Sequence, residues 1–286
     1  MILMYQKRYT INKIASTVAM NVLRDLYRNL HRYISPSEIS KDLNTTRANV
    51  YRGLNRIEEV GLLRRSSEKK RSLVRIDTSS RDAFPFFQLF NNERIRNLED
   101  STVQNIYNLI KNKEIKSVIL FGSYSRGQAT DRSDVDLLII TNKSDIEKEI
   151  RERAISMLPE TRFDIHFYTE ENLEKRSDLI MVDAILYGIS FAGDRLLYER
   201  RKSLESIDTS YIRWRLDSCM NNLKRSQKTE GEAGKYFINV ARRTLQEIIS
   251  VMRLDHDMDN TRQSIKEGIV LVKDDLKRRG EKIWLS

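Results

Sequence analysis

The segment from Ile119 to Ile140 constrains the fold of this chain more than any other. It reads as an apolar strand, a turn built on Gly122 and Ser123, a short basic helix, and a second apolar strand that opens with Asp134 and Asp136. Side chains two residues apart on a strand share a face, roughly 6.6 Å apart along it, so the two carboxylates are placed to flank one hard cation. A glycine turn brings backbone N–H groups and a helix N-terminus close to phosphate oxygens. The pattern therefore predicts a site for a metal-bound nucleoside triphosphate.

This arrangement resembles the signature of the DNA polymerase β-like nucleotidyltransferases, and within them the minimal, antitoxin-like nucleotidyltransferases. Their pattern is Gly-Ser-x-Ala-Arg-Gly-x-Ala-x3-Ser-Asp-x-Asp. The matching positions here are Gly122, Ser123, Arg126, Gly127, Ala129, Ser133, Asp134 and Asp136, and Ser125 stands in place of the first Ala. The resemblance implies that Asp134 and Asp136 bind metal and catalyse. It also implies a nucleotide-binding set made of Gly122, Ser123, Arg126 and Ser133.

The family resemblance implies a third carboxylate on a later strand. Residues 162–168 alternate strictly, so Phe163 and Ile165 face a core while Asp164 and His166 face the other way. Asp164 is therefore predicted to join the pair, either as a ligand of a second metal or as the base that takes the proton from an attacking hydroxyl. The alternative is an ordinary outward aspartate on a solvated edge strand. His166 is interpreted as a partly exposed structural histidine.

Together these residues imply a reaction. Mg²⁺ takes near-octahedral oxygen ligands and combines one or two carboxylates with substrate phosphates, which suits Asp134 and Asp136. Two such ions would stabilise the attacking and leaving oxygens of an in-line displacement at the α-phosphate of a nucleoside triphosphate, with ATP as the expected substrate. The expected products are pyrophosphate and an acceptor that carries a nucleoside monophosphate.

The composition is that expected of a soluble intracellular protein. The chain has 286 residues, of which 40% are apolar, and this suggests two or three domains with compact cores. The single cysteine, Cys219, excludes an intrachain disulfide framework. The N-terminal apolar run is too short for a signal peptide, and no stretch approaches the length needed to span a bilayer. We therefore expect a cytoplasmic protein without a membrane segment.

The net charge of +10 is unevenly distributed. Between Asn44 and Arg75 the chain has nine basic and three acidic residues, a net charge of +6. The spacing of apolar residues around this segment predicts a long helix over 11–31, a short helix that opens at Ser35, and a third helix capped by residues 44–46. Two strands, over 62–66 and 72–76, are predicted to follow.

This order of elements resembles a winged helix-turn-helix over residues 10–78. The resemblance implies that the third helix contacts double-stranded DNA and that the tip between the two strands reaches an adjacent groove or the backbone. The residues predicted to contact DNA are Thr46, Arg47, Asn49, Tyr51, Arg52, Arg56, Lys69, Lys70 and Arg71. The alternative is a solvated basic helix pair used for protein contact.

The sequence predicts an α+β multidomain fold. Residues 1–80 are expected to form the winged helix-turn-helix, and 81–91 an aromatic linker that docks two domains together or makes a homodimer contact. Residues 92–204 alternate strands and helices, as expected for a polymerase β-like α/β nucleotidyltransferase core. From 205 to 286 only helical periodicity remains, which predicts a helical bundle.

We therefore expect a Mg²⁺-dependent nucleotidyltransferase that moves a nucleoside monophosphate from an NTP to a hydroxyl, with DNA binding for regulation. The acceptor stays open among a side chain of a partner protein, a small molecule such as an aminoglycoside, and an RNA end. The alternative is a DNA-binding transcription regulator whose nucleotidyltransferase domain only senses nucleotide. The presence of all three carboxylates favours activity, because a sensor could have lost any of them.

Overall fold

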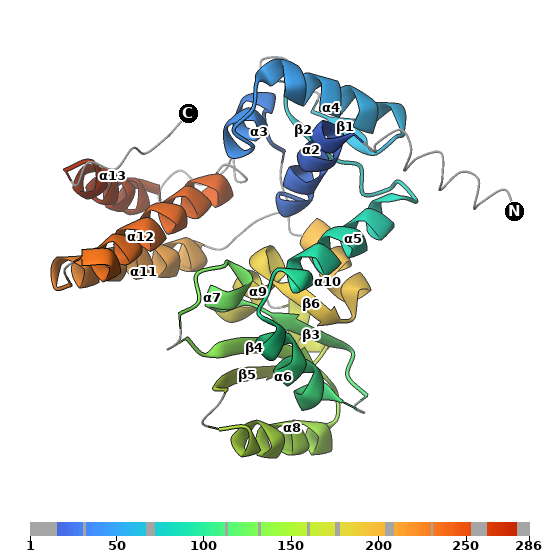
Figure 1. The fold of residues 1–286 in the computed structure, drawn as a ribbon, viewed down its shortest axis with the longest axis vertical. Coiled ribbons are helices and arrows are strands. Elements are labelled where there is room, and N and C mark those ends of the chain that lie inside the picture. The colour runs from blue at the N-terminus through green and yellow to red at the C-terminus, as the bar shows by residue number, and fades with distance from the viewer. Residues whose placement is uncertain are drawn as a thin grey trace, which may run out of the picture. The chain divides into compact units, whose positions relative to one another are not determined.

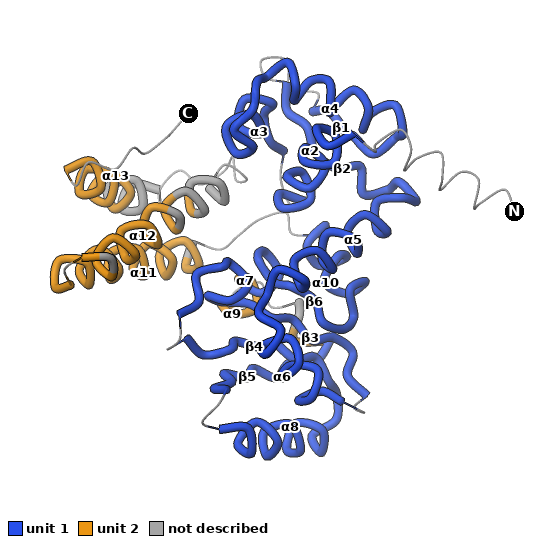
Figure 2. Tube along the Cα trace, in the orientation of Figure 1, with its two compact units in different colours: residues 1–170, 184–204 blue, residues 171–183, 205–286 orange. Residues whose placement is uncertain are grey.

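The computed structural model describes residues 16–30, 33–66, 72–111, 114–130, 133–158, 161–174, 178–203, 209–229, 231–252 and 262–278. These residues belong to two compact units (Figure 2). The first unit takes its residues from 1–170 and 184–204, and the second from 171–183 and 205–286. Helix α9 (Leu179–Tyr187) begins in the second unit and ends in the first.

The N-terminal segment of the first unit (residues 16–78) consists of three helices followed by a hairpin (Figure 1). Its elements are α2 (Thr17–Arg28), α3 (Pro36–Asp42), α4 (Arg47–Glu59), β1 (Leu63–Arg65) and β2 (Val74–Ile76), with the two strands antiparallel. Ser35 begins α3 through a capping box with Glu38, in which each side chain accepts the other residue's backbone N–H. The side chain of Thr46 accepts the N–H of Asn49 and so begins α4. The first residues of the helix predicted over 11–31 lie outside the described residues.

Helix α5 (Ala83–Arg96) occupies most of the stretch that the sequence predicts as a linker, 81–91. Pro85 falls in the first turn of this helix, where a missing N–H leaves no helical hydrogen bond unmade. The ring of Tyr27 in α2 packs against that of Phe90 in α5, with their centroids 5.3 Å apart. The aromatic stretch therefore joins the N-terminal segment to the rest of the first unit through a helix.

The core of the first unit is a four-stranded mixed sheet in the order β5-β4-β3-β6. Its strands are β3 (Ser117–Leu120), β4 (Val135–Ile140), β5 (Phe163–Tyr168) and β6 (Ile189–Ala192). β3 runs antiparallel to β4 and β6, whereas β4 and β5 are parallel. The parallel pair brings residues at the beginnings of β4 and β5 next to one another.

Helices pack on this sheet and follow its strands in the chain. α6 (Asp100–Ile110) and α8 (Ser144–Ser156) contribute Ile106, Leu109, Ile146 and Ile150 to one hydrophobic core with the apolar side chains of the strands. α10 (Asp194–Lys202) contacts α5, β3 and β6. The one-turn helix α7 (Gly122–Ser125) follows β3 directly, and the 3-10 helix η1 (Glu171–Glu174) follows β5.

In the second unit, α11 (Thr209–Gln227), α12 (Gly231–Met252) and α13 (Arg262–Arg278) contact one another. Buried residues recur on them at helical spacing: Leu216, Cys219 and Leu223, then Ala241, Leu245 and Ile248, then Ile269, Val272 and Leu276. The Cys219 thiol donates to the carbonyl of Ala241 at 3.1 Å, and burial raises the pKa of that thiol to about 12. Cys219 is therefore an inert core residue. In the part of the chain that the structure describes, each helix is too short or too polar to cross a membrane.

Candidate functional site

Two carboxylates lie opposite each other on the parallel strands. Asp136 of β4 and Asp164 of β5 are register partners, and Asp136 is half-buried while Asp164 is exposed. Burial, followed by the negative charges of Asp164 and Asp134, raises the pKa of Asp136 from 3.8 to about 6. Three carboxylates therefore converge on one region, and their mutual repulsion favours binding of a cation.

Asp134 lies immediately before β4 and not within it. The sequence predicts that Asp134 shares a strand face with Asp136, but β4 begins at Val135. One Asp134 oxygen, Oδ1, is buried and lies 3.3 Å from Nε of Arg162, an ion pair that lacks hydrogen-bond geometry. A buried carboxylate oxygen without a hydrogen bond is unusual in a folded protein.

The three carboxylates fit a hard cation by their chemistry, although the protein alone does not form a complete cage. Within the described ranges, no three His, Cys, Asp or Glu side chains are close enough together to hold a metal. Mg²⁺ typically keeps several waters and takes further oxygens from nucleotide phosphates. The donors present are thus of the kind that Mg²⁺ prefers.

The turn after β3 lies against Asp136. Gly122 has a φ of +67°, and a Cβ at that position would be 1.9 Å from Asp136 Oδ2. The N–H of Phe121 donates to the backbone carbonyl of Asp136 at 3.0 Å. Only glycine fits between this turn and the carboxylate, which explains why the chain has glycine here. The phosphate-binding turn of the sequence prediction and the carboxylates are therefore neighbours.

The other residues predicted to bind nucleotide surround α7. Ser123 is half-buried, and its carbonyl accepts the N–H of Gln128 at 2.9 Å. The Arg126 guanidinium lies 5.0 Å from the centroid of the Tyr187 ring, and its charge acts against the rise in the pKa of Asp136 that burial causes. Ser133 Oγ accepts the N–H of Thr130 at 2.9 Å, so this side chain shapes the loop that precedes Asp134.

His166 follows Asp164 by two residues on β5, so the two side chains lie on the same face of the strand. Its Nε2 lies 3.3 Å from Asp164 Oδ1, and its ring centroid lies 5.8 Å from that of Phe121. The side chain is 27% exposed. These contacts fit a histidine that supports Asp164 and packs against the turn.

Sequence reasoning missed Arg94 of α5. Its Nη2 donates to the carbonyls of Ser125 at 3.0 Å and Tyr187 at 2.6 Å, and its Nη1 donates to that of Gly188 at 2.7 Å. One guanidinium thus holds the end of α7 against the end of α9. Because all three partners are backbone carbonyls far away in the chain, no local sequence pattern marks this residue.

The residues predicted to contact DNA on α4 are largely accessible. Thr46, Arg47, Tyr51, Arg52 and Arg56 are exposed, and Asn49 is half-buried. Within this group, the Thr46 side chain caps α4 and the Asn49 side chain accepts from Arg52. The remaining predicted residues, Lys69, Lys70 and Arg71, lie outside the described residues.

Comparisons with known proteins match the part of the chain that holds the carboxylates. Residues 104–191 match the family model described as Polymerase beta, Nucleotidyltransferase. A protein of Methanocaldococcus jannaschii named "Putative protein adenylyltransferase" is 44% identical over 45 residues, which cover 15% of this chain and 45% of that relative. The chain therefore spans less than half the length of this relative. No solved structure gives a significant match. Residues 104–191, from α6 to β6, are a nucleotidyltransferase domain of the polymerase β kind.

Proposed function

We propose that this protein is a Mg²⁺-dependent enzyme that transfers a nucleoside monophosphate from an NTP to a hydroxyl group. The observation that carries the proposal is the convergence of Asp134, Asp136 and Asp164 beside the Gly122 turn. Two of these carboxylates are register partners, and the third keeps a buried oxygen without a hydrogen bond. Carboxylates are the protein ligands that Mg²⁺ typically combines with nucleotide phosphates, and this supports the proposal.

Each residue has a role in this proposal. When bound, Mg²⁺ supplies charge stabilisation for the attacking and leaving oxygens, and Asp134 and Asp136 are the residues that hold it. The Gly122–Ser123 turn and Arg126 bind the triphosphate through backbone N–H groups and positive charge. Asp164, the most accessible of the carboxylates, accepts the proton of the attacking hydroxyl or binds a second ion. A bond forms between the acceptor oxygen and the α-phosphorus, and pyrophosphate leaves.

The donor is proposed to be ATP and the acceptor a protein hydroxyl. The support is the name of the M. jannaschii relative, which describes protein adenylylation. A small molecule and an RNA end are the other acceptors to be tested.

The N-terminal segment is proposed to be a winged helix that binds double-stranded DNA and regulates the enzyme or its gene. The proposal is supported by the order of α2, α3, α4 and the β1–β2 hairpin, which is the order expected for a winged helix-turn-helix. Arg47, Arg52 and Arg56 are exposed on α4. An alternative function follows from the same segment: a DNA-binding regulator whose transferase domain only senses nucleotide.

One experiment separates the enzyme from the sensor. The protein is incubated with labelled ATP, GTP, CTP or UTP and Mg²⁺, with and without cell extract, beside the Asp136→Asn variant and a sample containing EDTA. The enzyme proposal expects label transferred from ATP to a protein band, and loss of that label in both controls. Tight nucleotide binding without label in any acceptor above the Asp136→Asn background would support the sensor instead.

A further inference from the structure

Two arginine side chains meet on a single carbonyl oxygen at the junction of α5 and α10. Arg94 donates to the carbonyl of Gly188 from Nη1 at 2.7 Å, and Arg201 donates to the same oxygen from Nη2 at 3.1 Å. Arg201 also donates from Nε to the carbonyl of Ile185 at 2.7 Å. Every acceptor of a hydrogen bond from these two guanidiniums is a neutral backbone carbonyl, and the Arg201 guanidinium also lies 5.5 Å from the centroid of the Phe87 ring. Two like charges are therefore held side by side, and no carboxylate among the described residues is hydrogen-bonded to either.

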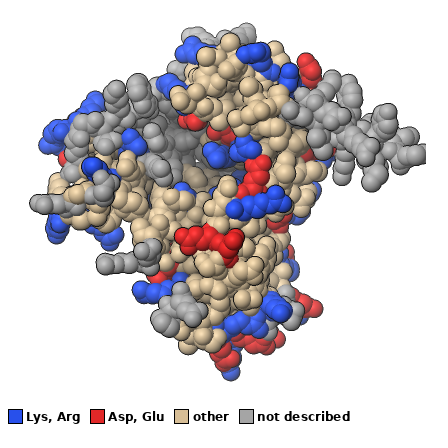
Figure 3. Space-filling model, viewed as in Figure 1, with Lys and Arg blue, Asp and Glu red and all other residues tan. Residues whose placement is uncertain are grey.

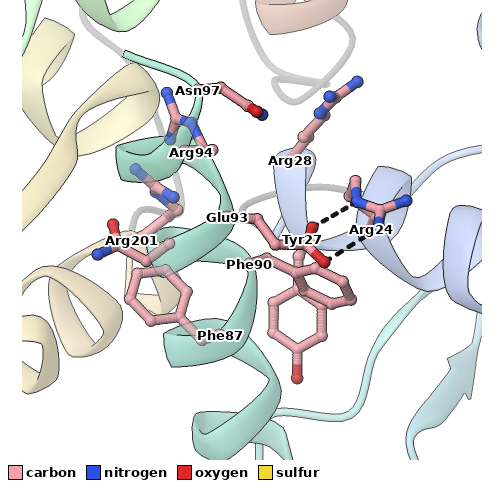
Figure 4. Close-up of a pocket in the computed structure, with 10 residues that line it drawn as sticks. Arg24, Tyr27, Arg28, Phe87, Phe90, Glu93, Arg94, Asn97 and Arg201 are labelled. Carbon is pink, nitrogen blue, oxygen red and sulfur yellow. Dashed lines mark hydrogen bonds and ion pairs between the residues drawn. The ribbon is translucent and has the colours of Figure 1, made fainter. Parts of the chain in front are cut away.

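The N-terminal segment brings further positive charge to the same place. Arg24 and Arg28 of α2 line one cavity together with Arg94 and Arg201, and its volume is about 70 Å³. Figure 4 shows Arg94 and Arg201 on one side and Arg24 and Arg28 on the other, with Asn97 near the top. Lys and Arg side chains also gather in the hollow below the N-terminal segment in Figure 3.

The single acidic side chain that lines this cavity is already engaged. Both oxygens of Glu93 accept from Arg24, at 2.8 and 3.1 Å, which neutralises that arginine. Among the residues that the structure describes, no ion pair compensates the charges of Arg28, Arg94 and Arg201 around the cavity. Hydrogen bonds use two of the five N–H groups of Arg201 and three of the five of Arg94, so donors remain. Burial, followed by the charges of Arg201, Arg28 and Arg126, lowers the pKa of Arg94 to about 9.

Such a cluster is unfavourable without an anion. Arg201 is buried and Arg94 beside it is half-buried, whereas buried charges are normally paired and like charges at close range oppose each other. One water needs about 10–15 Å³ of cavity volume. A cavity of about 70 Å³ therefore has room for several waters or for one small oxyanion. Guanidinium groups match the oxygens of phosphate in geometry and charge.

We propose that the cavity between α2, α5 and α10, lined by Arg28, Arg94 and Arg201, is a binding site for a small phosphate-class oxyanion, namely free phosphate or pyrophosphate. Bound there, the anion joins α2 of the N-terminal segment to α5 and α10. Arg94 also holds the carbonyl of Ser125 at the end of α7. The site therefore links the N-terminal segment to the turn that is proposed to bind nucleotide, and it does not depend on the proposed catalysis.

Binding is measured by isothermal titration of the full chain with inorganic phosphate and, separately, with pyrophosphate. EDTA is present, and NaCl keeps the ionic strength constant. The test variant is Arg28→Gln, because this side chain is exposed and its loss leaves the core intact. Arg201→Lys is the second variant, which keeps a charge but removes the planar fork. The matched control is Arg96→Gln, an exposed arginine on α5 that does not line the cavity.

The expected result is saturable anion binding by the wild type that weakens about tenfold in Arg28→Gln, as expected for the loss of one charge-assisted contact. Binding is unchanged in Arg96→Gln. A ratio of the two affinities that favours pyrophosphate identifies a diphosphate as the ligand, and the reverse identifies free phosphate. Equal binding by wild type and Arg28→Gln, or none beyond that of chloride, would overturn the proposal. Loss of affinity in Arg28→Gln for duplex DNA but not for the free anions would also overturn it, since the cluster would then contact a DNA backbone.

Discussion

Asp136 and Asp164 stand opposite one another on the parallel strands β4 and β5, and the Gly122 turn lies against Asp136. If these carboxylates hold the metal and activate the acceptor, Asp136→Asn removes charge at nearly constant shape. We expect transfer to fall by about a hundredfold or more, with an unchanged circular dichroism spectrum. Asp145→Asn, at an exposed aspartate in the first turn of α8, is the matched control and keeps its activity. Near-normal turnover in Asp136→Asn would show that the catalytic assignment is wrong.

The stability of the metal-free protein should depend on the same residue. The pKa of Asp136 is about 6 in the folded protein and near 3.8 in the unfolded chain. Between these two pH values the folded protein therefore binds more protons than the unfolded chain. The free energy of unfolding therefore decreases as the pH rises through that window, and it stays lower above pH 6. Asp136→Asn removes this dependence.

Thermal unfolding in EDTA at a series of pH values measures this effect. Above pH 6 the variant is expected to melt at a higher temperature than the wild type, with the difference narrowing towards pH 4. A wild type that is as stable as the variant at pH 7.5 would contradict the crowding of charge around Asp136.

Two glycines provide a matched test of the nucleotide turn. Gly122 and Gly127 both have positive φ, +67° and +63°, but a Cβ at Gly127 meets nothing within 4 Å, whereas one at Gly122 would meet Asp136 Oδ2 at 1.9 Å. Gly127→Ala should cost about 1 kcal/mol of stability from backbone strain alone. Gly122→Ala should cost more and should also abolish transfer, because the turn or the carboxylate must move. Equal effects on unfolding and on transfer rate would mean that the contact with Asp136 is unimportant.

Interactions between residues close together in the chain make much of this architecture predictable from the sequence. The structure differs from the prediction where contacts between distant residues determine the conformation. The capping box of Ser35 and Glu38 and the cap at Thr46 are local, so the starts of α3 and α4 are predictable. The aromatic stretch at 81–91 has no clear helical periodicity in the sequence, which is why a linker is predicted there. In the structure it is helical, and Phe90 packs against α2. Asp134 falls outside β4 because the strand begins at Val135, whose N–H donates to the carbonyl of Arg162 and which pairs with Phe163.

Contacts between side chains and remote backbone are the least predictable. Arg94 and Arg201 meet on the carbonyl of Gly188, although Arg94 is 94 residues away from that glycine in the chain. A carbonyl oxygen is the same for every residue type, so such a contact leaves no trace in the sequence pattern. The carboxylates can be predicted from the sequence, because their residue types and their spacing indicate the chemistry.

Ser123 and Arg126 are expected to contribute to triphosphate binding more than to metal binding. Each would contact phosphate oxygens, and loss of one charge-assisted hydrogen bond weakens binding by about tenfold to a hundredfold. Titration of Ser123→Ala and Arg126→Ala with a non-hydrolysable ATP analogue measures this loss. Arg126→Lys is the control, since it keeps the charge near the Tyr187 ring and should bind more tightly than Arg126→Ala. Wild-type affinity in both alanine variants would exclude them from the phosphate site.

The last prediction concerns the N-terminal segment alone. If Arg47, Arg52 and the residues Lys69, Lys70 and Arg71 contact phosphates, the affinity for duplex DNA falls steeply with salt, with a slope that grows with each phosphate neutralised. Changing Lys69, Lys70 and Arg71 together to Ala should flatten that slope by up to about three units. The matched control changes to Ala the exposed residues Lys224 and Arg225, in the last turn of α11, and Lys228, directly after it. The net charge then falls equally while the slope stays unchanged. Arg47→Ala or Arg52→Ala should also relax sequence preference if either reads a base.

The probe is the region upstream of the protein's own gene, measured against random duplex by fluorescence anisotropy. Equal affinity for both duplexes, together with wild-type slope in the triple variant, would rule out the regulator and leave the nucleotidyltransferase proposal intact.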